Sequence, residues 1–285
     1  MFFKPKYPYS KELKRPMSFG HVDMQKAIDN GGMLKSINFI TKPVRKFKTD
    51  EVILTQEAYQ SFDGEKIPFY LFTPKEKKDK YPAMIYYHGG GFMFPIQKPM
   101  MENSVIYTKE MGIKVFLPDF RISLQHSCDT IIKDCFEMLN YVIKYAEELQ
   151  VDTERVFVYG DSAGGSLAAC VTKLCRDKSD YKLCGQMLCY PVCDCESEKY
   201  ASVEQYKDAV WNKSANKAMW NTFLRNGTKE LQYVVPMRNT LQNLPRAYVE
   251  PLEIDILRDE AVTYADKLRE AGVEVVVILI PGAYH

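Results

Sequence analysis

The chain has 285 residues, with 38 basic and 37 acidic side chains and a formal net charge of +1. This balance argues against nucleic-acid binding, which needs a clustered basic excess. No apolar stretch is long enough for a transmembrane helix, and the first residues lack the apolar core of a secretory signal. We therefore expect a globular, cytoplasmic protein with no membrane span, and the sequence leaves a homodimer open.

Two strand-like segments, 51–60 and 67–73, open the regular part of the chain. They flank the turn-prone pair Asp63-Gly64 and predict a β-hairpin. Five later apolar runs predict strands that are buried on both faces of a parallel sheet. These runs are residues 81–87, 113–117, 155–159, 186–190 and 273–280.

Helical patterns lie between the predicted strands, over residues 131–146 and 260–271. The alternation predicts an α/β fold with a mostly parallel central sheet flanked by helices. Residues 195–236 interrupt the alternation, carry both tryptophans and predict a helical insertion. We accordingly divide the chain into an N-terminal segment, 1–50, and a sheet-containing unit, 51–285, that carries the insertion.

Eight cysteines are expected to be reduced thiols, because the chain is long and shows no secretory signal. Cys193 and Cys195 form a C-x-C pair, with Cys184 and Cys189 nearby. Zinc sites prefer C-x₂₋₄-C pairs with a second pair at a distance. We therefore expect buried or loop thiols here and no metal site.

The motif Gly160-Asp161-Ser162-Ala163-Gly164 satisfies G-x-S-x-G. It follows the apolar run 155–159 and precedes a plausible helix, which is the strand–turn–helix setting of a nucleophile elbow. The residues two before and two after the serine must be small, and glycine fills both positions. The motif therefore predicts that Ser162 projects above the sheet at the start of a helix, where the helix dipole favours developing negative charge.

The run His88-Gly89-Gly90-Gly91-Phe92 directly follows the predicted strand 81–87. Consecutive glycines allow backbone amides to approach a ligand closely, and in a hydrolase such amides bind an oxyanion. A flexible turn is the alternative interpretation. The serine motif further along the chain favours the oxyanion-binding interpretation.

A serine nucleophile needs a base, and the chain has only four histidines. His21 lies in the irregular N-terminal region, His88 is expected to brace the glycine loop, and His126 follows a serine-rich turn. His285 follows the last predicted strand and is the best candidate for the base.

The chain order Ser…Asp…His requires an acid between residues 162 and 285. Asp255 is the best candidate, and Asp259 and Glu253 are weaker alternatives. A helix N-cap or a loop carboxylate is the structural alternative for Asp255.

The motifs HGGGF, PDFRIS, GDSAGG, EIDILRDEA and PGAYH occur in this order between about residues 80 and 285. Together they resemble the hormone-sensitive-lipase-like family of α/β-hydrolase esterases. The resemblance implies an α/β-hydrolase fold with a helical cap, which residues 1–50 and the insertion would supply. It also implies Ser162 as nucleophile, Asp255 as acid and His285 as base.

The resemblance further implies an oxyanion hole made of the backbone amides of Gly90, Gly91 and Ala163. The implied activity is a serine carboxylic ester hydrolase that acts on short- to medium-chain acyl or acetyl esters, small-molecule substrates, with no metal or organic cofactor. Two alternatives stay open: a catalytically impaired protein that binds small molecules, and a peptidase or amidase of the same fold.

Aromatic residues are the candidates for substrate contact, namely Phe92, Trp211 and Trp220. Packing of the rings between cap and sheet is the favoured interpretation, and lining of an apolar acyl pocket is the second one.

The sequence departs from the family at two places. The family motif D-Y-R-L-A-P-E reads DFRISLQ here, and Asp119 and Arg121 are expected to hold this loop. The family continues past the histidine with a Gly-Phe pair and a closing helix, whereas this sequence stops at His285. We therefore expect the C-terminal helix to be missing and the histidine to be poorly held.

Overall fold

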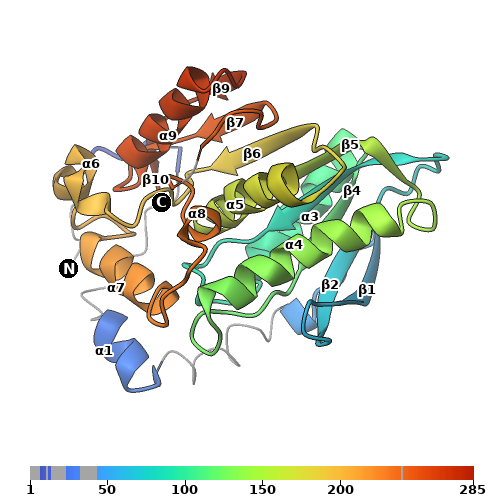
Figure 1. Ribbon diagram of the computed structural model, residues 1–285, viewed down its shortest axis with the longest axis horizontal. Coiled ribbons are helices and arrows are strands. Elements are labelled where there is room, and N and C mark those ends of the chain that lie inside the picture. The colour runs from blue at the N-terminus through green and yellow to red at the C-terminus, as the bar shows by residue number, and fades with distance from the viewer. Residues whose placement is uncertain (1–6, 11, 14–23, 33–43, 239) are drawn as a thin grey trace.

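An eight-stranded, mostly parallel sheet runs through the protein in the computed structural model, which describes residues 7–10, 12–13, 24–32, 44–238 and 240–285 (Figure 1). Its strand order is β1-β2-β4-β3-β5-β6-β7-β9. The pairs β1–β2 and β2–β4 are antiparallel, and every other neighbouring pair is parallel. The strands are β1 (Ile53–Gln60), β2 (Lys66–Thr73), β3 (Tyr81–Tyr87), β4 (Lys114–Pro118), β5 (Val151–Asp161), β6 (Gly185–Cys189), β7 (Ala247–Glu250) and β9 (Val275–Val277).

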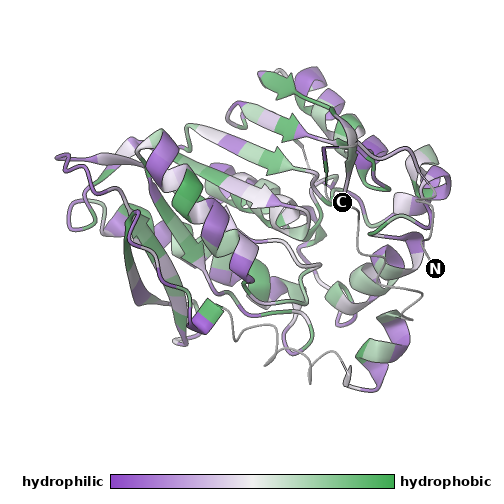
Figure 2. Cartoon of the chain, turned by 180° about the vertical axis from the view of Figure 1, so that it is seen from behind, coloured by the Kyte–Doolittle hydropathy of each residue, from purple (hydrophilic) through white to green (hydrophobic). Residues whose placement is uncertain are grey.

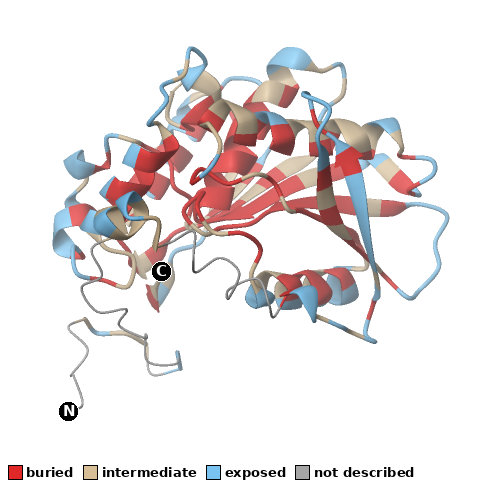
Figure 3. Ribbon diagram, turned by 90° about the horizontal axis from the view of Figure 1, so that it is seen from below, coloured by how far each residue is buried: buried red, intermediate tan, exposed pale blue. Residues whose placement is uncertain are grey.

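Helices cover both faces of the sheet. One face packs against α4 (Cys128–Lys144), α5 (Ala163–Lys178) and α9 (Arg258–Glu270), and the other against α3 (Lys98–Met111). Hydrophobic residues concentrate along the strands (Figure 2), and the central strands and inner helix faces are buried, whereas β1 at the edge is largely exposed (Figure 3). The structure thus confirms the expected layers and the β1–β2 hairpin.

The sequence patterns missed α3. Its buried positions are Met101, Ser104, Val105 and Thr108, so half of its inner face is polar. An apolar repeat at helical spacing is therefore weak in this segment.

The single strand predicted over residues 273–280 is wrong. The segment divides into β9, at the edge of the main sheet, and β10 (Ile280–Tyr284), which pairs in parallel with β8 (Leu252–Ile254) in a separate two-stranded sheet. The run is also not buried on both faces, because Val276 and Ile278 are 50% and 46% exposed. Continuous apolar character does not distinguish a central strand from an edge strand that then turns away.

The segment between β6 and β7 is helical, as expected. It contains η1 (Ser197–Lys199), α6 (Ala201–Gln205), α7 (Lys213–Phe223) and α8 (Leu231–Val234). The short helix α1 (Met24–Asp29) packs against α7, but most of the segment 1–50, including His21, lies outside the described residues. Within the described ranges, no helix has both the length and the apolar character needed to cross a membrane.

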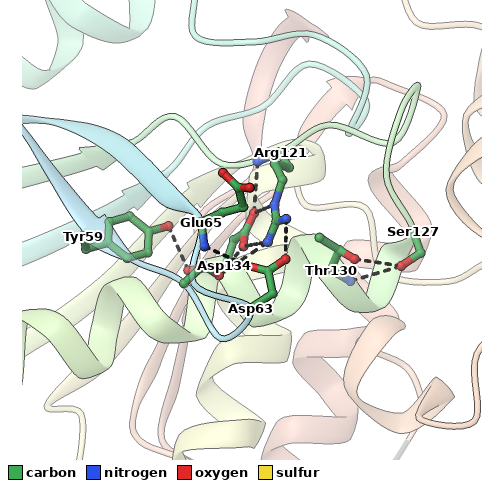
Figure 4. Close-up of polar contacts among 8 residues, drawn as sticks. Tyr59, Asp63, Glu65, Arg121, Ser127, Thr130 and Asp134 are labelled. Atoms are coloured by element: carbon green, nitrogen blue, oxygen red, sulfur yellow. Dashed lines mark hydrogen bonds and ion pairs between the residues drawn. The ribbon is translucent and has the colours of Figure 1, made fainter.

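A buried ion-pair network joins the hairpin, the loop after β4 and α4 (Figure 4). The guanidinium of Arg121 donates to both carboxylate oxygens of Asp134, at 2.6 and 2.8 Å, and to Asp63 at 2.6 Å. Ser61 donates to Asp134 at 2.5 Å. Since these hydrogen bonds raise the pKa of Arg121 further above its usual value, the arginine stays charged and holds the loop, as the sequence led us to expect.

Replacing Asp134 by alanine should strongly destabilise the fold, because Arg121 would keep a largely buried charge without its main partner. We expect a loss of about 3 kcal/mol in the free energy of unfolding, measured by urea denaturation. Asp152→Ala, which breaks the exposed pair with Arg155, is the matched control and should change little. Equal effects of the two substitutions would contradict this role of the network.

Candidate active site

Ser162 occupies a sharp turn between β5 and α5. Its φ of 55° and ψ of −122° are unusual for a residue with a side chain. Two backbone hydrogen bonds hold this conformation: its N–H donates to the carbonyl of Cys189 at 2.9 Å, and its carbonyl accepts from Val192 at 3.0 Å. The last residue of β6 and the segment that follows it therefore fix the turn.

The glycines around Ser162 are required by direct backbone contacts. A β-carbon on Gly160 would overlap the carbonyl of Gly164, and one on Gly164 would overlap the carbonyl of Tyr87. Both overlaps are far closer than any real β-carbon contact. The motif requires small residues here because the turn packs tightly on itself and against β3.

The small sheet of β8 and β10 brings together two chain segments that are distant in the sequence. Ile254 and Tyr284 are paired positions at the ends of these parallel strands. The next residues, Asp255 and His285, therefore lie side by side. Glu253 reinforces the pairing, because its carboxylate accepts a 2.6 Å hydrogen bond from the N–H of Gly282.

The three side chains predicted to act together form a continuous hydrogen-bonded chain. Ser162 Oγ lies 2.9 Å from His285 Nε2, and His285 Nδ1 lies 2.8 Å from Asp255 Oδ2. Asp255 is fully buried, and its other oxygen accepts from the N–H of Leu257 at 3.0 Å. This geometry can transfer a proton from the serine to the imidazole while the carboxylate orients the ring.

The two alternative acids make other contacts. Asp259 accepts a 2.8 Å hydrogen bond from the N–H of Ser202, and Glu253 binds Gly282 as described. Among the three carboxylates, the structure pairs only Asp255 with His285.

His88 lies away from this chain and supports the glycine loop, as expected. Its Nδ1 is 2.8 Å from the carbonyl of Gly89, and its ring stacks on Phe120 with centroids 4.2 Å apart. Burial lowers the pKa of His88 to about 4, so the ring is neutral near pH 7.

The glycine loop faces the serine turn and is tied to it. Gly90 and Gly91 have φ values of 107° and 60°, in the left-handed region that favours glycine. Their N–H groups donate in none of the loop hydrogen bonds formed among the described residues. Ala163 begins α5, so its N–H is at the start of the helix. These three donors are therefore available to a ligand.

Asp161 is a residue of the site that the sequence analysis did not single out. Its carboxylate accepts from the N–H of Gly89 at 3.2 Å, and burial raises its pKa to about 6. Asp161 directly precedes Ser162, so this hydrogen bond connects the glycine loop to the serine turn. Its position inside the serine motif was the available signal.

The three aromatic candidates occupy different environments. Phe92 is buried and stacks on Phe223 with centroids 3.9 Å apart, and Trp220, also buried, lies 5.9 Å from Phe92. Trp211 is half-buried and lies 5.8 Å from the ring of His285. Contacts of Phe92 and Trp220 are those of core packing, whereas Trp211 contacts the predicted base.

All eight cysteines are free thiols in the structure. In the described part of the chain, no group of three or more histidine, cysteine, aspartate or glutamate side chains could hold a metal ion.

Comparisons with known proteins show the family of the chain. The profile of a family described as alpha/beta hydrolase fold matches residues 84–285. The chain is 28% identical over 255 residues to carboxylesterase NlhH of Mycobacterium tuberculosis (strain CDC 1551 / Oshkosh), covering 85% of this chain and 79% of that protein. It is 28% identical over 233 residues to the ethyl acetate hydrolase of Pseudomonas putida, covering 78% of this chain and 72% of that protein. A solved structure of a bacterial heroin esterase superposes with a TM-score of 0.84 at 27% identity, covering 94% of this chain and 87% of that one.

Gly164→Ala should prevent the turn from packing against β3, because the new methyl group would overlap the carbonyl of Tyr87. We expect a large fall in the thermal unfolding midpoint or loss of soluble protein. Gly185→Ala in β6 is the control, since its β-carbon would meet only ordinary contacts of 3.6 Å or more. A Gly164→Ala protein as stable as Gly185→Ala would contradict this account of the turn.

Proposed function

The chain belongs to the alpha/beta hydrolase fold family, and from this premise we propose that it is a serine carboxylic ester hydrolase. The observation that carries the proposal is the hydrogen-bonded chain Ser162–His285–Asp255. The carboxylesterases among its relatives support the same reaction. A complete chain of nucleophile, base and acid favours an enzyme over a binding protein that has lost catalysis.

In the proposed mechanism, Ser162 Oγ attacks the ester carbonyl while His285 Nε2 takes the hydroxyl proton. Asp255 holds the imidazole in the required tautomer and stabilises the imidazolium. His285 then gives the proton to the leaving alkoxide oxygen, which frees the alcohol and leaves an acyl group on Ser162. A water molecule, deprotonated by His285, attacks the acyl-enzyme and releases the carboxylic acid.

The developing oxyanion would be bound by the N–H groups of Gly90, Gly91 and Ala163. Such donors act because they are already oriented where the negative charge forms, and removing one typically costs about 10²- to 10³-fold in rate. Asp161 supports this function by holding Gly89 at the start of the glycine loop.

The proposed substrates are esters with acetyl or other short- to medium-chain acyl groups. The ethyl acetate hydrolase and arylesterase among the relatives support small esters. Ser162 is only 6% exposed, which favours narrow substrates that reach it beneath the helical insertion.

Ser162→Ala should reduce the hydrolysis of p-nitrophenyl acetate and butanoate by roughly 10⁴-fold or more, because the nucleophile is removed. The unfolding midpoint should stay close to that of the wild type. Ser166→Ala, in the helix that follows Ser162 and without a side-chain contact to His285, is the control and should retain activity. Substantial serine-independent turnover by the Ser162→Ala protein would overturn the proposal.

Asp255→Asn should lower kcat by about 10⁴-fold, since the amide cannot hold the imidazole in the working tautomer. Asp259→Asn tests the alternative acid and should cost less than about tenfold, because this carboxylate is bound to Ser202. Steady-state kinetics on p-nitrophenyl acetate measures both, and the reverse ranking would assign the acid to Asp259.

A further inference from the structure

Trp211 lies close to both the glycine loop and the proposed base. Its ring centroid is 5.8 Å from that of His285, and the two planes are inclined by 34°. A β-carbon placed on Gly91 would lie 3.2 Å from the Cη2 atom of the same indole. One side chain from the loop before α7 therefore contacts both halves of the proposed site.

The indole is held in this place by a chain of polar contacts. Its Nε1–H donates to Asn216 Oδ1 at 3.1 Å, and Asn216 Nδ2 donates to Ser197 Oγ at 2.9 Å. Asn216 is 2% exposed, so its amide has few alternative partners. A ring fixed in this way forms a wall of the site, because it cannot move aside without breaking a buried hydrogen bond.

The chemistry of ester cleavage indicates which part of the substrate meets this wall. The leaving oxygen must lie within hydrogen-bond distance of His285 Nε2 to receive its proton, and the carbonyl oxygen must lie at the N–H groups of the glycine loop. A ring that spans His285 and Gly91 therefore covers the side on which the alcohol part leaves. The acyl substituent points away from the imidazole.

We propose, on the basis of the function proposed above, that Trp211 determines selectivity for the alcohol part of the ester. The flat, fixed indole admits small or planar alcohol groups and excludes puckered or branched ones. Tyr190 also packs on the imidazole, with the two rings at 79° to each other and their centroids 5.2 Å apart. Trp220 does not contribute to this selectivity, since it packs with Phe92 and Phe223 in the core.

The test compares two ester series by acid release at constant pH. One series varies the alcohol at a fixed acetyl group: ethyl, phenyl and cyclohexyl acetate. The other varies the acyl group at a fixed alcohol: ethyl acetate, butanoate and hexanoate. In Trp211→Ala, kcat/KM for cyclohexyl acetate relative to ethyl acetate should rise by roughly tenfold or more, as when a steric clash in a pocket is removed. The acyl-series ratios should stay within about threefold of the wild type.

Two further variants separate selectivity from stability. Asn216→Leu keeps the indole but removes its hydrogen bond, so the alcohol ratio should rise by a smaller factor; this variant also carries the test if Trp211→Ala does not fold. Trp220→Phe is the matched control and should leave both sets of ratios unchanged even if the unfolding midpoint falls.

Unchanged alcohol ratios in a folded Trp211→Ala protein, or a change confined to the acyl series, would overturn the inference. Wild-type protein that hydrolyses none of the esters would instead refute the proposed function, so the two failures are distinguishable.

Discussion

The pairing of β8 with β10, outside the main sheet, is the contact on which the candidate triad depends. Its register places the two residues that follow the strands, Asp255 and His285, next to each other. A second constraint comes from the N-terminal side, because the carbonyl of Gly282 accepts a hydrogen bond from Ser10 and the ring of Tyr284 packs on Tyr9. Backbone pairing between β8 and β10 thus aligns the acid and the base.

The nucleophile depends on a different kind of constraint, which is close packing of backbone against backbone. Gly164 lies so close to the carbonyl of Tyr87 that no side chain fits, and the strained conformation of Ser162 is held by hydrogen bonds to the segment after β6. Strain at such a turn persists only where surrounding structure fixes it. The central strands β3, β5 and β6 therefore supply both the fold's core and the fixed position of the serine.

Local patterns allowed much of this to be predicted. The serine turn and the glycine loop are determined by neighbouring residues, so their motifs were informative, and the hairpin followed from Asp63-Gly64. The division of residues 273–280 was not predictable, because an apolar run carries no signal for where a strand leaves the sheet. The network of Arg121 joins the hairpin, the loop after β4 and α4. Arg121 had been singled out for the loop and Asp63 for the turn, but the ion pairs among them and Asp134 were not predicted. The different surroundings of Trp211 and Trp220 likewise depend on tertiary packing that spacing does not encode.

The insertion is anchored at both ends to the segments that directly follow Asp255 and Ser162 in the chain. Near the start of the insertion, Ser202 makes two hydrogen bonds. Its N–H donates to Asp259 in α9, and its hydroxyl donates to the carbonyl of Ile256, the residue after Asp255. Near its end, Lys173 of α5 is buried and donates to four backbone carbonyls between residues 232 and 238. Burial lowers the pKa of Lys173. Moving the insertion away would leave both the buried lysine and these carbonyls without their hydrogen bonds, so the contact holds the end of the insertion against α5. The segment that carries Trp211 is therefore fixed to the parts of the chain that directly follow Ser162 and Asp255. Selection among alcohols would then be made by a rigid surface and not by a moving lid.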